Sequence, residues 1–362
     1  MSRNRPVFLM RELSLPLRAG FDSSTIAELG HNKKHHMDRL SSIVVGTDFS
    51  PCSTVAIGQA LRLATWNRAK IHVAHIIDTF VVIDIENRLT TMQTAIRENL
   101  IADAQEAWKN LAPQMAPYEG ASKLQLEVEI NNRITGLIRL AAKAEADLLV
   151  LGAYGAKAPD VGIGTVATGC VRKAHCDVLL MRDTQSGPFK SIVVCIDFSD
   201  TSRQALERAA RLAAQDGSQL HIVHIYDNAI NLLPFFSTVT EAWQNVMTDL
   251  EKNSRTRLEA FCAELGPEGS YLKPKLYLAT AATHGWGIIE AVKALKADLV
   301  VLGTRGRTNL RDILLGSTAE RVLRESPCSI LAIKPAGFTH PLSADETAAT
   351  VPAKDILTKR EL

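Results

Sequence analysis

An internal repeat constrains the fold of this chain more than any other feature of its sequence. Three segments return in the same order, each 149 to 151 residues later: Ser42–Ser50 as Ser191–Ser199, Ile71–Asp78 as Leu220–Asp227, and Ala146–Gly152 as Ala297–Gly303. Solenoid units are far shorter, at about 20–45 residues. The repeat therefore indicates a duplicated domain, in keeping with a length of 362 residues.

Each copy alternates short apolar runs with helical patterns. In the first copy the runs are Ile43–Val45, Ile71–Ile77, Leu124–Ile130, Leu148–Leu151 and Val178–Met181. Such continuous runs suit parallel strands buried on both faces of a sheet. Small apolar residues at helical spacing follow the first run of each copy: Ala56, Ala60, Leu61 and Ala64, then Ala205, Ala209, Ala210 and Ala213. We predict an α/β fold of two tandem, doubly wound, Rossmann-like domains, each with a five-stranded parallel sheet.

Composition shifts predict the boundaries. We expect a basic, disordered extension at 1–39, a first domain at 40–183, a linker at 184–190, a second domain at 191–335 and a disordered tail at 336–362. The extension is rich in arginine and lacks an apolar signal core. An organelle-targeting segment is an alternative, and Met37 could be the natural start. The histidines around 31–36 could catch metal, although a solvated linker is favoured.

Bulk properties exclude several classes of function. A net charge of +2 lacks the clustered basic face of a nucleic-acid binder, and no apolar run approaches the roughly 20 residues of a membrane helix. The six cysteines are scattered without a Cys-x-x-Cys pair, which favours core packing in a reducing compartment. We therefore expect a cytoplasmic protein with no metal site of its own.

The stretch from Gly303 to Ser317 carries the clearest binding signal. Gly303 and Gly306 follow a strand, where glycine lets the backbone approach a ligand closely. Gly316 and Ser317 then open a predicted helix at 317–325, whose first amides favour an anion. Asp197 ends the first strand of the same sheet, and ligands gather at this edge of open α/β sheets.

These residues resemble a known family. The spacing Gly303-x2-Gly306-x9-Gly316-Ser317 is similar to the signature of ATP-binding universal stress proteins, and the similarity runs over 40–183 and 190–335. The resemblance implies that Asp197 holds the base or ribose, that the backbone at Ile225 meets adenine, and that the three glycines and Ser317 cradle the phosphates of ATP with Mg²⁺. It also implies an intramolecular pair of domains, joined through their last strands at Val178–Met181 and Ser329–Ile333.

The first copy departs from this pattern. Its weaker second site would comprise Asp48, Ile76, Gly152, Gly155, Gly164 and Thr165. Eight residues rather than nine separate Gly155 from Gly164, and this loop lacks the excess of arginine that Arg305 and Arg307 give the second loop. Arginine grips phosphate oxygens bidentately. We predict that the second copy binds ATP, while the first binds weakly or is structural.

Other interpretations stay open. The glycine loops could be plain strand–helix turns, Asp48 and Asp197 could only stabilise helix starts, and the histidines within strands are favoured as core residues. The Gly162-x-Gly164 string lies too far from its strand to be a dinucleotide fingerprint. Without a clear general base, dedicated catalysis is weakly supported. An ATP-responsive regulator leads over a slow ATPase or nucleotidyl-transfer enzyme and a nucleotide-free interaction module. A homodimer, and a lipid-like ligand at 232–236, also stay open.

Overall fold

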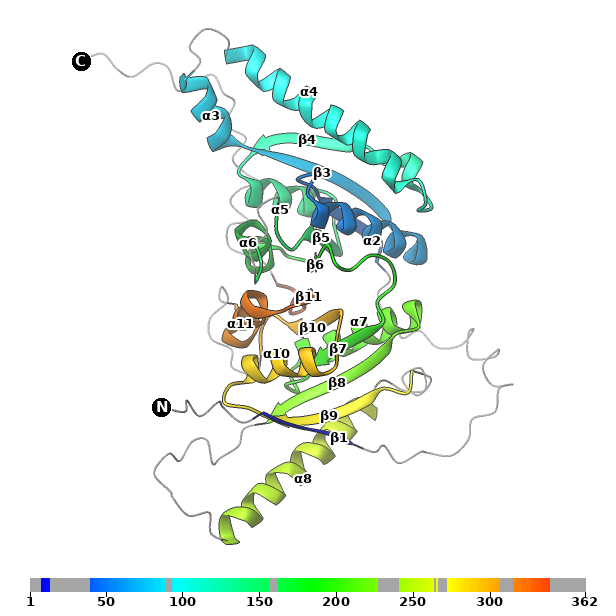
Figure 1. The fold of residues 1–362 in the computed structure, drawn as a ribbon, viewed down its shortest axis with the longest axis vertical. Coiled ribbons are helices and arrows are strands. Elements are labelled where there is room, and N and C mark those ends of the chain that lie inside the picture. Colours follow the sequence, from blue (N-terminus) through cyan, green and yellow to red (C-terminus); the bar gives the residue numbers. More distant parts are fainter. Residues whose placement is uncertain are drawn as a thin grey trace, which may run out of the picture.

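A computed structural model describes residues 8–13, 40–88, 93–155, 162–226, 241–263, 265, 272–306 and 315–338. They form an eleven-stranded sheet in the order β1-β9-β8-β7-β10-β11-β6-β5-β2-β3-β4, with one copy above the other in Figure 1. The first copy supplies β2 (Ser42–Gly46), β3 (Lys70–Asp78), β4 (Leu126–Asn131), β5 (Leu148–Gly152) and β6 (Asp177–Met181). The second supplies β7 (Ser191–Cys195), β8 (Gln219–Tyr226), β9 (Lys275–Thr280), β10 (Leu299–Gly303) and β11 (Ser329–Ile333).

Helices cover both faces of this sheet. In the first copy they are α2 (Pro51–Asn67), α3 (Thr79–Arg88), α4 (Gln93–Leu111), α5 (Arg133–Lys143) and α6 (Thr165–Lys173), with 3-10 turns at Ala112–Met115 and Ala121–Lys123. In the second they are α7 (Asp200–Asp216), α8 (Glu241–Ala263), α10 (His284–Ala294) and α11 (Ser317–Glu325). Within each copy the five strands run parallel, so the predicted fold class is confirmed. The alanine stripes of α2 and α7 are buried against the sheet, as their spacing predicts.

The two copies meet through their last strands. β6 and β11 pair antiparallel, with Leu179 opposite Leu331, and so join two parallel sheets into one. This is the predicted pairing. Both strands are buried along their whole length, which removes two apolar edges from water.

The expectation that residues 1–39 are disordered is wrong for residues 9–13. They form β1 (Leu9–Leu13), which pairs antiparallel with β9 at the far edge of the second copy (Figure 1). Phe8 contacts the ring of Trp286 at 6.0 Å between centroids, and Leu13 is buried in the core. Apolar side chains and free backbone groups of an edge strand together explain the pairing.

Two segments expected as linker and tail also pack. Phe189, within the linker, is 1% exposed, and its amide donates to Asp216 Oδ2 at 2.8 Å. Residues 336–338 continue the folded second copy, and the ring of Phe338 lies 4.7 Å from the guanidinium of Arg305. Residues 339–362 lie outside the described ranges.

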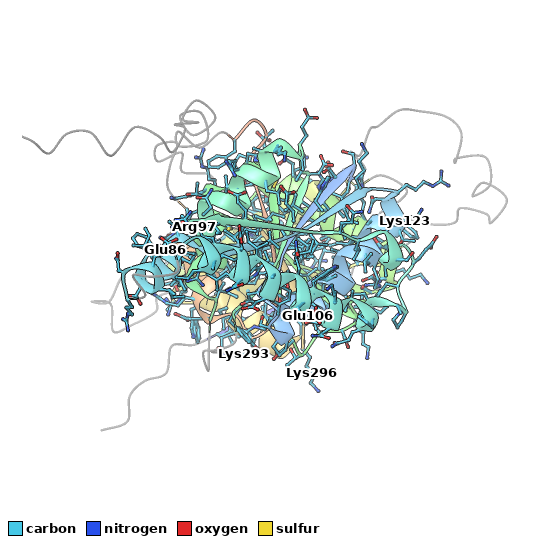
Figure 2. All side chains as sticks on the ribbon, turned by 90° about the horizontal axis from the view of Figure 1, so that it is seen from above. Glu86, Arg97, Glu106, Lys123, Lys293 and Lys296 are labelled. Atoms are coloured by element: carbon cyan, nitrogen blue, oxygen red, sulfur yellow. The ribbon has the colours of Figure 1, made fainter. Side chains whose placement is uncertain are left out.

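Ion pairs tie the outer helices of the first copy together. Figure 2 shows Glu86 of α3 beside Arg97 of α4, with Arg97 Nε 2.7 Å from Glu86 Oε1. This contact lowers the pKa of Glu86, because the guanidinium donates to its carboxylate. Among the described residues, no helix combines the length and apolar character needed to cross a membrane.

Candidate functional site

Asp197 is positioned by a histidine from the neighbouring strand. His224 Nδ1, on β8, lies 2.8 Å from the carbonyl oxygen of Ile196, and because that oxygen can only accept, Nδ1 carries the proton. Burial lowers the pKa of His224, which keeps the ring neutral. Phe198 adopts φ 64° and its ring contacts His224 at 4.4 Å between centroids. The sharp turn after β7 is thus held from its neighbour, and the carboxylate of Asp197 projects at the strand end.

The two oxygens of the Asp197 carboxylate have different neighbours. Oδ1 accepts from the amide of Ser199 at 3.0 Å and from its hydroxyl at 2.6 Å, and Ser199 caps α7. Oδ2 faces Gly306, where an added β-carbon would lie 2.7 Å away. The helix-stabilising interpretation therefore holds for one oxygen, while the other faces the glycine loop.

Glycine is required at Gly303 and Gly306 by close approach. A β-carbon on Gly303 would lie 2.8 Å from Thr201 Cγ2, and one on Gly306 would meet the aspartate. Real β-carbon contacts are longer, so any side chain would displace its neighbours. The loop therefore approaches Asp197 this closely only because position 306 has no side chain.

The loop ends at the open start of α11. Gly316 is its extended N-cap, and no side chain caps the helix. The amide of Gly316 donates to Thr304 O at 3.0 Å, which brings the helix start back to the end of β10. Ser317 is exposed. Gly303, Gly306, Gly316, Ser317 and Asp197 are thus brought to one edge of the sheet, where free amides favour an anion.

The remaining predicted residues divide into three cases. Arg305 lies beside the site with its guanidinium on Phe338, and Arg307 lies outside the described residues. Ile225 on β8 is 5% exposed, with its side chain next to Gly287, so only its backbone could meet a base. Ile76 on β3 is 6% exposed and lies against Gly136 in the same way.

The first copy has the same geometry despite its shorter loop. A β-carbon on Gly155 would lie 2.6 Å from Asp48 Oδ2, and Gly164 donates to Ala153 O at 2.7 Å. Gly152 lies against Cys52, and Thr165 opens α6, also without a side-chain cap. The flanks of the two loops therefore do not separate the copies. Residues 156–161 and 307–314 lie outside the described ranges.

The clearest difference is at the third position of the loop. Where the second copy has Arg305, the first has Tyr154, whose hydroxyl donates to Asp183 Oδ1 at 2.7 Å. Burial, followed by the contacts with Asp183 and Cys52, raises the pKa of Tyr154. This tyrosine is neutral and engaged within the protein, so it adds no positive charge for a phosphate.

The sequence favours the strand histidines as core residues but does not identify the backbone oxygens that they contact. His75 Nδ1 lies 2.8 Å from Thr47 O in the first copy, the equivalent of the His224 contact. A histidine stands at the same place in both repeats, and this was an available signal. A buried histidine needs a hydrogen-bond partner, so its repetition indicates that the partner is repeated as well. The cations Arg182 and Lys334, which follow the two last strands, are buried at the joint between the copies.

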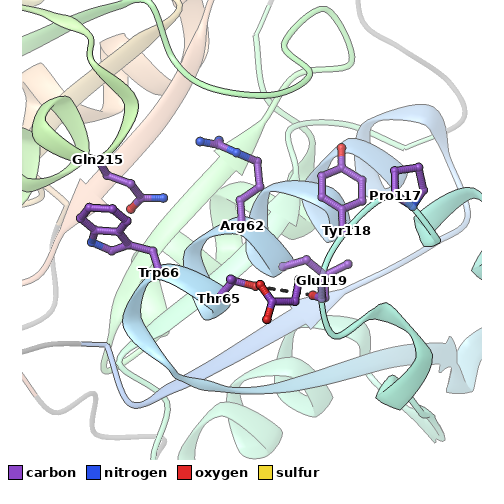
Figure 3. Close-up of a pocket in the computed structure, with 8 residues that line it drawn as sticks. Arg62, Thr65, Trp66, Pro117, Tyr118, Glu119 and Gln215 are labelled. Atoms are coloured by element: carbon purple, nitrogen blue, oxygen red, sulfur yellow. Dashed lines mark hydrogen bonds between the residues drawn. The ribbon is translucent and has the colours of Figure 1, made fainter.

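A separate concavity of about 340 Å³ lies between the copies, away from this site (Figure 3). It is lined by the last turns of α2, the segment Pro117–Glu119 and Gln215 of α7. Because α2 begins at the carboxyl end of β2, its last turns lie toward the amino-terminal ends of the strands, on the side of the sheet away from the glycine loops. Arg62 on its wall pairs with Asp216 of the second copy at 2.6 Å.

Comparison with known proteins identifies the family. The sequence matches the universal stress protein family over residues 40–182 and again over 188–334. A universal stress protein of Mycolicibacterium smegmatis is 25% identical over 299 residues, covering 81% of this chain and 97% of that protein. One from Methanocaldococcus jannaschii is 29% identical over 147 residues, which is 40% of this chain and 82% of that protein.

Solved structures agree on the fold. The structure of a universal stress protein from Archaeoglobus fulgidus superposes with a TM-score of 0.55 at 20% identity, covering 81% of this chain and 98% of that one. The described residues contain no group of three His, Cys, Asp or Glu side chains that could hold a metal ion. With the family matched across both copies of the repeat, the chain belongs to the universal stress protein family as a tandem of two of its domains.

Proposed function

We propose that this protein is an ATP-binding regulator in the stress response and that the second copy holds the nucleotide. One observation supports the binding site: the bare backbone at Gly306 faces Asp197 Oδ2 beside the uncapped start of α11. The choice of the second copy rests on Arg305, because the first copy has the neutral Tyr154 at that position. A carboxylate accepts from ribose hydroxyls or an adenine amino group, and the free amides of a helix start bind phosphate oxygens.

The proposed ligand fits the donor set present. Asp197 would hold the base or ribose, the backbone at Ile225 would meet adenine, and Gly303, Gly306, Gly316 and Ser317 would cradle the phosphates, with Arg305 and Arg307 adding charge. Mg²⁺ would accompany the phosphates as their counterion. The six free cysteines support a reducing, cytoplasmic location.

The assignment of ATP to the second copy is tested by nucleotide stoichiometry. Isothermal titration and native mass spectrometry would be run on the wild type, Gly306→Val and Gly155→Val. Gly306→Val should weaken the tight site by about 100-fold, or about 2.7 kcal/mol, because its side chain fills the space before Asp197. Gly155→Val is the matched control and should leave the tight site intact. Equal losses would refute the difference between the copies, and no binding by wild type would refute the function.

A nucleotide-free interaction module is the second candidate. The buried β6–β11 pairing makes the fused domains an internal pseudo-dimer whatever they bind. A slow ATPase has less support, because the described site places only Asp197 near the loop, and Oδ1 of that carboxylate is already engaged by Ser199.

A further inference from the structure

Arg182 is a buried cation at the joint between the copies, just beyond β6. It is 8% exposed, and its Nη2 donates to Ser326 O at 2.7 Å and to Gly162 O at 3.0 Å. Ser326 is the C-cap of α11 in the second copy, whereas Gly162 belongs to the glycine loop of the first. One guanidinium group therefore connects the end of the second copy's helix to the loop of the first copy.

The loop of the first copy also rests directly on that helix. Gly162 adopts φ +100°, and a β-carbon there would lie 2.6 Å from Arg324 O. No side chain fits between the loop and the last turn of α11. Arg182 is also 5.5 Å from the ring centroid of Tyr154, which comes from the same loop. Arg182 and the last turn of α11 thus contact Gly162 and Tyr154, which lie on either side of the loop's middle residues.

The helix between the two sites is short and continuous. α11 has nine residues, or about 13 Å of helix, and its first residues are where the second copy would hold phosphate. Its last carbonyls are where Arg182 and Gly162 attach. A hydrogen-bonded helix of this length moves as a unit, and packed joints adopt discrete arrangements rather than deforming continuously.

Resting on the proposed function, we propose that Arg182 is a positioning residue that couples nucleotide occupancy of the second copy to the position of Gly162 in the first copy. An anion drawn onto the start of α11 shifts the helix, and Arg182 passes that shift to Gly162. Any such coupling is reciprocal, so the state of the first loop alters nucleotide affinity at the second site.

The corresponding cation of the second copy makes different contacts. Lys334 Nζ donates to Val171 O at 2.5 Å and to Arg172 O at 3.4 Å, both in the last turn of α6. Each copy thus supplies a cation to the other copy's last helix, where a positive charge favours the exposed carbonyls. Arg182 extends this arrangement by also bonding a glycine loop.

The test follows amide hydrogen exchange in the full-length protein as ATP and Mg²⁺ are added. The reporters are the amides of Ala153 and Gly164, which donate to Met181 O and Ala153 O and belong to the first copy's loop. In wild type, ATP should change the exchange rate at Gly164 by about fivefold. In Arg182→Gln, ATP should still bind with the tight-site stoichiometry, and the rate at Gly164 should no longer respond.

Three further variants isolate the route. Ser329→Ala removes the acceptor of the Arg182 backbone amide, 3.2 Å away at the same joint, but leaves the guanidinium contacts, so the response should persist. Gly162→Ala pushes the loop off Arg324 O and should abolish the response, which covers the case in which Arg182→Gln does not fold. Gly306→Val removes the second copy's ligand and should abolish the response as well.

The outcomes separate the two proposals. Failure of wild type to bind ATP would overturn nucleotide binding itself. Binding without any change at Gly164 would overturn the coupling alone. The coupling is also overturned by a response that survives in Arg182→Gln, or by one that survives in Gly306→Val, since the ligand would then act on the first copy directly. A response lost equally in Ser329→Ala would overturn the role of the Arg182 guanidinium, because any disturbance of the joint would then abolish the response.

Discussion

The two copies share a backbone arrangement at their glycine loops and differ in the side chains around it. Gly155 and Gly306 face Asp48 and Asp197 at nearly the same separation, 2.6 Å and 2.7 Å for an added β-carbon. Behind them, the first copy has Tyr154 hydrogen-bonded to Asp183, and the second has Arg305 lying on Phe338. The two halves therefore share the backbone arrangement of the glycine loop, while the third loop residue is a cation in the second copy and a neutral tyrosine in the first.

A second difference lies at the joint, where each copy inserts a cation into the other. Arg182 is a fixed guanidinium that bonds carbonyls from two elements, Gly162 O and Ser326 O. Lys334 is an amine that bonds two adjacent carbonyls of one helix. Burial, together with nearby Arg305, lowers the pKa of Lys334 to about 8, although Cys176 and Asp177 oppose this shift. The two copies are therefore joined by different contacts on their two sides.

The largest effect should come from removing these cations one at a time. Arg182→Met leaves carbonyls of two elements unpaired in the interior and should lower the free energy of unfolding by about 3–5 kcal/mol. Lys334→Met should cost less, about 1–2 kcal/mol, because the charged amine is already penalised by burial. Urea denaturation of both variants near pH 7 checks this order. A larger loss for Lys334→Met would contradict the asymmetry.

The outer edges of the two copies also differ. β4 carries Glu127 and Glu129, paired with Lys143 and Arg139 of α5, whereas β9 is covered by β1. Leu13→Asp places a charge in the core and should cost about 2–3 kcal/mol. Freed from β1, the edge of β9, where Lys275 at its start is the one charged residue, should also associate with other chains.

Light scattering together with denaturation measures both consequences of Leu13→Asp. The control is Leu9→Asp in the same strand, where the native side chain is 58% exposed and the cost should stay below about 0.5 kcal/mol. Equal costs at the two positions would mean that β1 is held by its backbone pairing alone.

The sequence predicted the elements whose signals are local. The helix at Ser317–Glu325 has the predicted bounds and begins directly after Gly316. The pairing of the last strands is not local, and it was predicted from the family resemblance. β1 was not predicted, because five residues of weak alternation gain order only from an edge strand more than 260 residues away.

Two features of the site also escaped prediction, for different physical reasons. Arg182 follows its strand as any solvated cation might, and only the fold brings Ser326, 144 residues along the chain, to its guanidinium. The first loop was expected to depart from the second because it is one residue shorter. Its flanking residues nevertheless keep the geometry, since Gly155 and Gly164 are held by contacts with Asp48 and Ala153.

The protonation of Lys334 makes the joint sensitive to pH. Its folded pKa of about 8 lies below the ordinary 10.5, so the unfolded chain binds more protons between these values. Stability from this group is therefore lowest below about pH 8 and rises toward pH 10.5. Between about pH 7.5 and pH 9.5 the gain should be about 1–2 kcal/mol.

Buried thiols act in the opposite direction at high pH. Burial raises the pKa of Cys176 to about 12, so its contribution to stability falls as the unfolded thiol ionises. The informative quantity is therefore the difference between wild type and Lys334→Met at each pH. That difference should grow in favour of wild type with rising pH, and a flat difference would mean that the amine stays charged.

The smallest effect should come from exchanging the third loop residues between the copies. Arg305→Tyr removes a charge beside the proposed phosphates and should weaken ATP binding about fivefold, or about 1 kcal/mol. Adenosine, which carries no phosphate, should bind Arg305→Tyr and wild type alike. The reciprocal Tyr154→Arg should strengthen any ATP binding by the first copy, and both effects should shrink as salt screens the charges. Equal weakening for adenosine and ATP would mean that Arg305 shapes the loop through its contact with Phe338 rather than by its charge, and the difference between the copies would then be one of packing.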